Sequence, residues 1–372
     1  VLIDQRGTGG SNSLDCTGDA VDDDLLSMED YPIDRYRECL DRLDADPRLY
    51  TTAMAMDDID EVRRYLGYGE INLWGGSYGT RAALVYLKRH DASVRTAVLD
   101  GVAPPDMRLP LFAARDSQRA LDRLIADCSR DAGCARRFPD LSGSVVTVWA
   151  RVAERPQVSF SHPRTGEVQT ITITPRLLGA VVFQSLYSPE LSALLPRLLT
   201  DAAAGQYQGL LALAFTRDIP KGAMSDGMFL SVVCAEDMPR IGEQDIARET
   251  AGRFLGATLF ETQVRPCEFW PRGDVPPDYY APLATSRPVL MFSGDNDPVT
   301  PPSWGEHVLP GLSHARHLVV PGAGHITLTH GCVPDLVAAF LASANVAALN
   351  PSCLEALARP PFFTSYTGPE LP

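Results

Sequence analysis

The sequence has no long apolar run and comparatively few basic residues. No uninterrupted apolar stretch approaches the roughly 20 residues that a membrane-spanning helix needs. The 33 Lys and Arg residues are outnumbered by 47 Asp and Glu residues, which gives a formal net charge of −14. Because nucleic acids and anionic lipid surfaces are bound through excess positive charge, we expect no nucleic acid and no membrane among the partners.

Motifs for metals and nucleotides are also missing. The cysteines include no CxxC pair, and no histidine cluster lies beside them at the spacing of zinc ligands, so a metal site is the weaker interpretation. The glycine-rich run that starts at Gly7 does not continue as the dinucleotide motif GxGxxG, because position 12 is Asn12. We therefore predict neither a metal nor an organic cofactor.

Cysteine is well represented, and its eight residues lie as four pairs of near neighbours. The pairs are Cys16 with Cys39, Cys128 with Cys134, Cys234 with Cys267, and Cys332 with Cys353. An even number of cysteines in close pairs favours four disulfides, with short loops between the partners. Disulfides persist in oxidising compartments, so this pattern predicts a secreted or periplasmic protein.

Short apolar runs alternate with helical patterns in two parts of the chain. A chain of 372 residues exceeds what one hydrophobic core usually organises, so two units, or one core with a large insertion, are expected. One helix is expected to begin at Pro32, and another to run from about Asp57 to Gly67. This alternation predicts an α/β sheet with helices on both faces. The runs typical of buried parallel strands are residues 1–3, 71–74, 97–99, 289–292 and 318–320.

The alternation stops between Pro104 and about Thr285. Long amphipathic runs at 111–125 and 177–199 predict a mainly helical segment here. Residues 158–160 and 168–173 flank a Pro-Arg-Thr-Gly turn and predict one β-hairpin within it. We therefore divide the chain into a first core part at 1–104, an insertion at 105–285 and a second core part at 286–372.

Residues 75–79 read Gly-Gly-Ser-Tyr-Gly and match GxSxG. The motif follows the apolar run 71–74 and precedes a helical pattern, which is the strand–turn–helix context of a nucleophile elbow. Such a turn exposes the serine oxygen at a helix N-terminus, where developing negative charge is favoured. We predict Ser77 as a nucleophile, against the alternative of a glycine-rich turn with an incidental serine.

A nucleophilic serine needs a base, and the base needs an acid that orients it. Asp295 and Asp297 follow the expected strand 289–292, and His325 lies in a glycine-rich turn directly after the expected strand 318–320. The order Ser, acid, His fits this fold class. The other six histidines, His330 foremost, are expected at surface or structural positions. The residues themselves leave the choice between Asp295 and Asp297 open.

Four segments together resemble one group of enzymes. Residues 1–9, 75–79, 294–301 and 322–325 are similar to the prolyl-aminopeptidase and tripeptidyl-aminopeptidase group of α/β-hydrolases. The resemblance implies the α/β-hydrolase fold, with a mostly parallel central sheet and with the insertion as a helical cap. It also implies that Asp297, which directly precedes a Pro-Val-Thr-Pro run, completes the triad. The main-chain N–H of Tyr78 would then be one oxyanion donor.

The resemblance extends to the substrate. In this group, acidic residues of the cap hold the free amino terminus of a peptide, and Glu236 is our first candidate for that role, with Asp237 second. The alternative is a solvated acidic pair beside a disulfide. The expected function is an aminopeptidase that acts on a peptide or a small amide or ester. An esterase is the alternative, and a non-catalytic binding protein on a hydrolase scaffold is a third interpretation.

One feature departs from the group. Its members carry a His-Gly-Gly-Pro-Gly-like loop before the Asp-Gln-Arg-Gly segment, and that loop donates the second oxyanion hydrogen bond. The present sequence begins at this segment, with Asp4 to Gly7. We therefore expect an upstream segment, in the same polypeptide or in a cleaved chain, that carries this loop and the strand before it.

Overall fold

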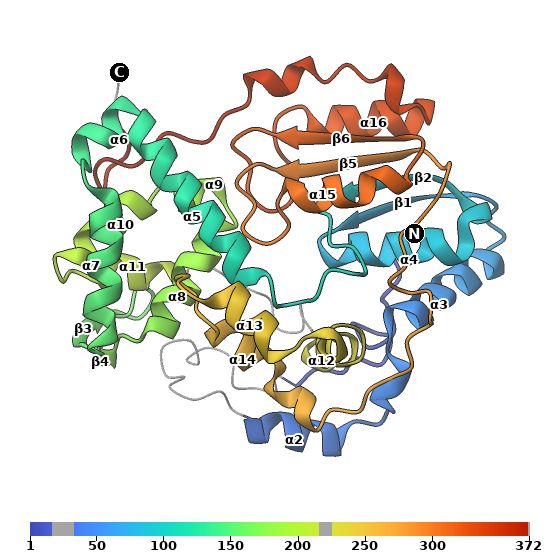
Figure 1. The fold of residues 1–372 in the computed structure, drawn as a ribbon, viewed down its shortest axis with the longest axis horizontal. Coiled ribbons are helices and arrows are strands. Elements are labelled where there is room, and N and C mark those ends of the chain that lie inside the picture. The colour runs from blue at the N-terminus through green and yellow to red at the C-terminus, as the bar shows by residue number, and fades with distance from the viewer. Residues whose placement is uncertain (17–32, 216–224, 371–372) are drawn as a thin grey trace.

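A computed structural model describes residues 1–16, 33–215 and 225–370. Its centre is a four-stranded parallel sheet with the order β1-β2-β5-β6 (Figure 1). These strands contain four of the five predicted apolar runs, and the central parallel sheet agrees with the predicted fold class. The strands are β1 (Ile71–Gly76), β2 (Val94–Asp100), β5 (Val289–Gly294) and β6 (Ala315–Val320).

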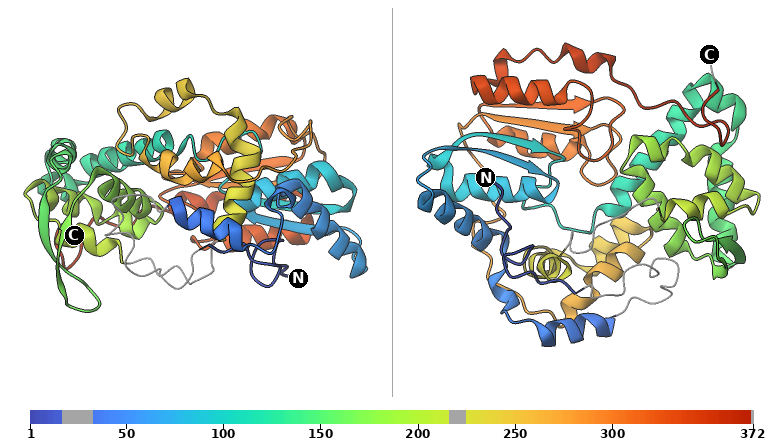
Figure 2. Two further views of the ribbon diagram at one scale, coloured as in Figure 1. Left: turned by 90° about the horizontal axis from the view of Figure 1, so that it is seen from below. Right: turned by 180° about the vertical axis from the view of Figure 1, so that it is seen from behind.

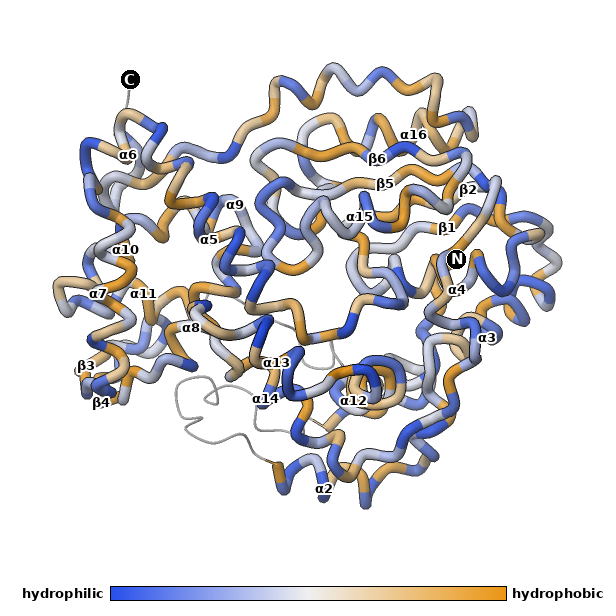
Figure 3. The backbone as a smooth tube through the Cα atoms, in the orientation of Figure 1, coloured by the Kyte–Doolittle hydropathy of each residue, from blue (hydrophilic) through white to orange (hydrophobic). Residues whose placement is uncertain are grey.

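Burial explains why these runs form strands. β5 is buried along its whole length, and β2 is buried except for Arg95. Such strands are apolar on both faces, because helices cover both sides of a parallel sheet. Figure 3 shows the hydrophobic colouring along β5. β1 lies at the edge of the sheet, and its alternate residues, Trp74 among them, are exposed.

The prediction of a buried strand at residues 1–3 is wrong. Val1 and Leu2 are almost fully exposed, at 82% and 102%, and the segment belongs to neither described sheet. A strand is stable only when its backbone groups pair with a neighbour. Three apolar residues do not indicate whether a neighbouring strand is present, whereas a longer apolar run flanked by helices indicates a strand inside a sheet.

Different helices cover the two faces of the sheet. Leu99 and Met291 belong to the hydrophobic cluster that includes α3 (Thr52–Tyr65) and α4 (Tyr78–His90). Val98 and Phe292 belong to the cluster that includes α16 (Val333–Ser343). Neighbouring residues of a strand thus serve opposite layers, as the two-residue period of a strand requires.

The predicted helices form, and the second begins earlier than predicted. The helix expected from Pro32 is α2 (Ile33–Arg42), and Pro32 itself lies outside the described residues. The helix expected from about Asp57 begins earlier, at Thr52, because the Glu236 carboxylate accepts the Thr52 amide at 2.6 Å. A carboxylate at a helix N-terminus satisfies a free amide and favours the helix dipole. This contact is distant in sequence, so no local pattern could place the start.

The segment between β2 and β5 is mainly helical and has its own hydrophobic core, which includes Leu121, Val148, Leu178 and Leu199. The run 177–199 is divided among three helices, because new helices begin near Pro189 and Pro196. Figures 1 and 2 show α5 to α11 gathered at the end of the molecule away from β1. The helices are α5 (Ala113–Arg130), α6 (Ala132–Arg137), α7 (Leu141–Ala153), α8 (Pro175–Leu186), α9 (Pro189–Ser192), α10 (Leu195–Ala203), α11 (Gln208–Leu213), α12 (Asp226–Val232), α13 (Glu243–Thr250) and α14 (Thr258–Val264).

Two further predictions are confirmed. The hairpin forms as the antiparallel pair β3 (Gln157–Ser161) and β4 (Val168–Thr172). All four predicted disulfides are present, with separations of 23, 6, 33 and 21 residues in chain order. Within the described residues, no helix combines the length and apolar character needed to cross a membrane.

Candidate active site

Ser77 stands at a tight turn between β1 and α4. Its backbone has φ +53° and ψ −122°, a conformation that residues with a side chain seldom adopt. Gly75 lies so close to the end of the turn that a Cβ there would be 2.2 Å from the carbonyl oxygen of Gly79. The absence of a side chain at Gly75 therefore allows a sharp strand-to-helix turn, as a nucleophile elbow requires.

His325 and Asp297 form a direct hydrogen-bonded pair. Nδ1 of His325 lies 2.8 Å from Oδ2 of Asp297. The carboxylate is fully buried and also accepts the backbone amides of Val299 and Thr300, both at 2.8 Å. Burial alone would raise the pKa of Asp297, but the neighbouring His325 and these hydrogen bonds lower it below its ordinary value. Asp297 is thus an ionised acceptor that orients the imidazole.

The strand ends bring these residues to one edge of the sheet. Ser77 follows β1, Asp297 follows β5 and His325 follows β6, and all four strands are parallel. Gly101, after β2, lies beneath the pair: a Cβ there would be 2.9 Å from Oγ1 of Thr300 and 3.3 Å from Cε1 of His325. This edge is where ligands meet an open α/β sheet.

Asp295 has different partners. Its carboxylate accepts the backbone amide of Gly322 at 2.8 Å and forms an ion pair with Arg123 on α5. It therefore joins the turn after β5 to the turn after β6 and to the insertion. Of the two carboxylates that the residues alone could not separate, the one beside the imidazole is Asp297.

Tyr78 opens helix α4, so its main-chain N–H lies in the first turn, where amides lack an acceptor within the helix. This is the position expected for an oxyanion donor. The phenol serves a structural purpose, since its oxygen lies 2.8 Å from Oγ1 of Thr52 and 3.2 Å from Nε2 of Gln5. Burial, followed by the charge of Glu236, raises the pKa of Tyr78 to about 12.

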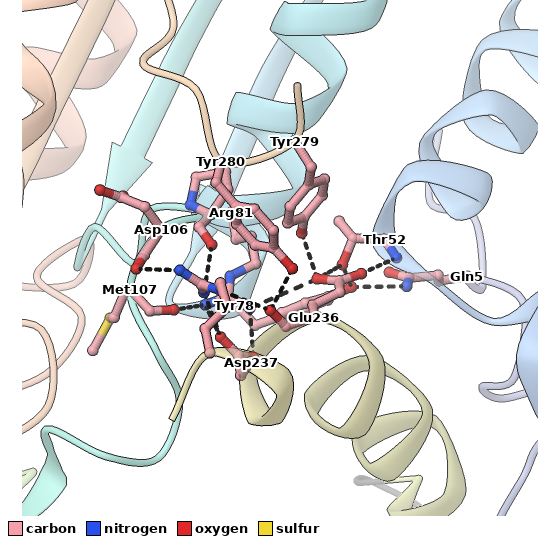
Figure 4. Close-up of polar contacts among 12 residues, drawn as sticks. Gln5, Thr52, Tyr78, Arg81, Asp106, Met107, Glu236, Asp237, Tyr279 and Tyr280 are labelled. Carbon is pink, nitrogen blue, oxygen red and sulfur yellow. Dashed lines mark hydrogen bonds and ion pairs between the residues drawn. The ribbon is translucent and has the colours of Figure 1, made fainter. Parts of the chain in front are cut away.

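The predicted ammonium site at Glu236 and Asp237 is wrong. Both carboxylates are fully buried and bound to protein groups (Figure 4). Glu236 accepts the amide of Thr52 at 2.6 Å, its hydroxyl at 3.0 Å, and the hydroxyl of Tyr279. Asp237 pairs with two nitrogens of Arg81 at 2.8 and 3.2 Å. The alternative of a solvated acidic pair is wrong as well, because neither side chain reaches solvent.

This buried network joins the insertion to the nucleophile helix. Arg81 extends from α4 and also donates to the carbonyl of Met107 at 2.6 Å, at the start of the insertion. Tyr280, near its end, donates to the carbonyl of Glu236 at 2.7 Å. Burial raises the pKa of both carboxyl groups, and Arg81 opposes that shift. Removing one member of such a buried pair costs about 3–5 kcal/mol.

Sequence reasoning missed Arg81 and Asp100, although each had a signal. Arg81 stands inside an apolar helical run, and a charge in a buried helix requires a partner. Asp100 directly follows the apolar run 97–99, and Asp295 and Asp297 likewise lie after the end of an apolar run. In the described part of the chain, no group of three or more His, Cys, Asp or Glu side chains is placed to hold a metal ion.

Two family models match the chain, one from each core part, and both matches extend into the insertion. A model described as the alpha/beta hydrolase fold matches residues 1–137, which include Ser77. A model described as a TAP-like protein matches residues 252–353, which include Asp297 and His325. The chain is an α/β-hydrolase. The fold predicted from the strand pattern and from the resemblance is therefore confirmed.

Curated relatives of this α/β-hydrolase include peptidases. The serine protease Hip1 of Mycobacterium tuberculosis (strain H37Rv) is 28% identical over 388 residues, which cover 92% of this chain and 72% of Hip1. The proline iminopeptidase of Neisseria gonorrhoeae is 29% identical over 102 residues, 27% of this chain and 23% of that protein. A solved esterase from Exiguobacterium antarcticum aligns with a TM-score of 0.30 and 17% identity, over 82% of this chain and 77% of the esterase. The α/β-hydrolase is a serine hydrolase.

Proposed function

We propose that the protein is an aminopeptidase in which Ser77, His325 and Asp297 form the catalytic triad. The proposal rests on one observation: Ser77 and His325 lie at the same edge of the sheet. The backbone of Ser77 has φ +53°, and His325 is hydrogen-bonded to the buried carboxylate of Asp297 at 2.8 Å. Nucleophile, base and orienting acid are the three parts that acyl transfer requires.

Each residue has a defined step. His325 removes the proton from Oγ of Ser77, which bonds to the scissile carbonyl carbon, while the amide of Tyr78 donates to the oxyanion. The C–N bond then breaks, and His325 returns the proton to the leaving amine. Water, activated by His325, hydrolyses the acyl-enzyme and restores Ser77. Asp297 stabilises the imidazolium in both halves of the reaction.

The relatives support a peptide as substrate. Hip1 is named a serine protease, a second relative is a proline iminopeptidase, and one family model is TAP-like. We therefore favour removal of one residue or a short peptide from a free N-terminus over hydrolysis of an ester. Thr52 and Tyr279 bind Glu236, which favours another group as the binding site of the substrate ammonium. The four disulfides support a secreted or periplasmic location.

A substrate panel tests the proposal. Aminoacyl-, prolyl- and tripeptidyl-arylamides, each with a free and a blocked amino terminus, are compared with short-chain aryl esters. Free-amino arylamides should be cleaved fastest, and Ser77→Ala should lower every rate by about 10⁴-fold or more. Turnover of esters alone would select the esterase, and the absence of any turnover that depends on Ser77 would leave only the binding protein.

A further inference from the structure

Asp100 lies where the elements of the proposed site meet. It is the last residue of β2, which runs between β1 and β5 (Figure 1). In the sheet register it stands opposite Gly76, the residue before Ser77, and opposite Phe292 on β5. Its side chain is buried, with 1% of the residue exposed. A carboxylate in such a position needs partners.

The main chain of Asp100 binds the nucleophile turn. Its carbonyl oxygen accepts the backbone N–H of Ser77 at 2.9 Å. This bond continues the ladder between β1 and β2 by one residue, beyond the end of β1. It therefore fixes the peptide plane that leads into the positive-φ conformation of Ser77.

The side chain of Asp100 binds the histidine loop. One carboxylate oxygen accepts the amides of Thr327 at 2.7 Å and Leu328 at 2.8 Å, and the other accepts the hydroxyl of Thr327 at 3.0 Å. These donors follow His325 by two and three residues. Between His325 and Thr327 lies Ile326 with φ +69°, a backbone conformation that a β-branched residue adopts only when its surroundings impose it.

We propose that Asp100 is a positioning residue that holds the nucleophile turn and the histidine loop in register with each other. The inference rests on the proposed roles of Ser77 and His325. A single residue binds both turns, Ser77 through its carbonyl and the loop through its carboxylate. The hydrogen bonds that its carboxylate accepts come from Thr327 and Leu328, so it acts on His325 through the loop.

A carboxylate suits this arrangement of donors. Three donors converge on its two oxygens. An asparagine that kept its carbonyl oxygen toward the two amides would turn its NH₂ group toward the Thr327 hydroxyl, which would have to rotate and accept. Burial raises the pKa of Asp100 above its ordinary value, and the hydrogen bonds from Thr327 and Leu328 oppose this shift without cancelling it. Because Oδ2 accepts two backbone N–H groups, the carboxyl proton cannot reside there without breaking one of them.

The test compares Asp100→Asn with Asp60→Asn, the same substitution at another buried aspartate. Asp60 lies on α3, is 6% exposed and bonds to Arg63 and Tyr86. We expect Asp100→Asn to lower kcat by about 10- to 100-fold with KM changed by less than about 3-fold, because misplaced groups slow the chemical step more than binding. The rate of Ser77 labelling by a fluorophosphonate should fall in parallel. Asp60→Asn should lose stability and keep both rates.

Thr327 supplies a milder variant and a rescue. Thr327→Val removes only the hydroxyl bond to Asp100 and should lower kcat by about 3- to 10-fold, while Thr327→Ser should restore it to within about 2-fold. If folded Asp100→Asn has wild-type rates, the role of Asp100 is overturned and the proposed function is not affected. If Asp100→Asn does not fold, wild-type rates in Thr327→Val overturn it in the same way. If the wild-type protein itself is not labelled at Ser77, the proposed function fails, and the inference with it.

Discussion

Nδ1 of His325 lies 2.8 Å from Oδ2 of Asp297, whereas Asp295, two residues earlier, binds the amide of Gly322 at the same distance. Two carboxylates in one turn thus have separate tasks. Asp297 is buried and directed at the imidazole, and Asp295 ties two turns together and meets Arg123. Their substitution should therefore have separate consequences.

Asp297→Asn should lower kcat by about 10⁴-fold, because the neutral amide no longer holds the correct imidazole tautomer or stabilises its protonated form. Asp295→Asn should lower kcat by less than about 10-fold, since its partners are structural. Steady-state kinetics of both variants on one arylamide provide the measurement. A larger loss in Asp295→Asn would show that the acid has been assigned to the wrong residue.

Glu236→Gln should affect all substrates equally. The glutamine NH₂ group would face one of the donors that now bind the carboxylate, either Thr52 or Tyr279. The disturbance would reach the first turn of α4 through the contact between Thr52 and Tyr78. We expect the ratio of kcat/KM for free-amino and N-blocked substrates to stay within about 2-fold of wild type. A loss confined to free-amino substrates would restore the ammonium-binding role.

Asp60 should contribute stability that acid removes. Burial opposes its ionisation, but hydrogen bonds from Arg63 and Tyr86 outweigh burial and lower the pKa of Asp60 from 3.8 to about 2. A carboxyl group whose pKa is lower in the folded state stabilises the fold at pH values above its unfolded-state pKa. This contribution is lost as pH falls from about 4 toward 2. The loss should be about 1–2 kcal/mol. Urea unfolding at pH 5 and pH 2.5 measures it.

Two variants serve as comparisons for the urea unfolding experiment. Asp60→Asn should be less stable than wild type at pH 5 and should lose less further stability at pH 2.5. Asp46→Asn, at an exposed pair with Arg48, should behave like wild type because solvent screens that pair. Equal acid sensitivity of wild type and Asp60→Asn would contradict the argument.

The disulfides should differ in their contribution to stability. Cys234–Cys267 closes a separation of 33 residues and Cys128–Cys134 one of 6. In the chain-entropy model the disulfide that closes the longer loop stabilises the fold by about 4 kcal/mol, and the one that closes the shorter loop by about 2 kcal/mol. Replacing each pair with alanines and comparing urea midpoints tests the order. A larger loss from the short loop would mean that local packing, and not loop closure, dominates.

The parts of the fold that the sequence predicts are those determined by local pattern. The runs at 97–99 and 289–292 read as strands because β2 and β5 are buried on both faces, and Ser77 stands in a motif that local backbone geometry imposes. Residues 1–3 have the same apolar character, but the pattern carries no information about a pairing neighbour. The same limit explains why α3 begins before its predicted start.

The errors at the site arise from contacts between distant residues. Arg81 and Asp237 are 156 residues apart in the sequence, so the residues around Asp237 do not indicate that a buried cation pairs with it. Asp297 was selected by resemblance, and its contact with His325 spans 28 residues. Asp100 binds Thr327 across 227 residues. Residue type shows what a group can do, and the tertiary fold determines which partner it meets.

Covalent trapping of Ser77 is the most direct measurement of the central claim. The protein is incubated with a fluorophosphonate, digested and examined by mass spectrometry, with Ser77→Ala and His325→Ala as comparisons. The account predicts one phosphonylated peptide that contains Ser77, no adduct in Ser77→Ala, and labelling slowed by about 10³-fold or more in His325→Ala, because the serine depends on its base. An adduct on another residue, or labelling of Ser77 at the wild-type rate without His325, would contradict it.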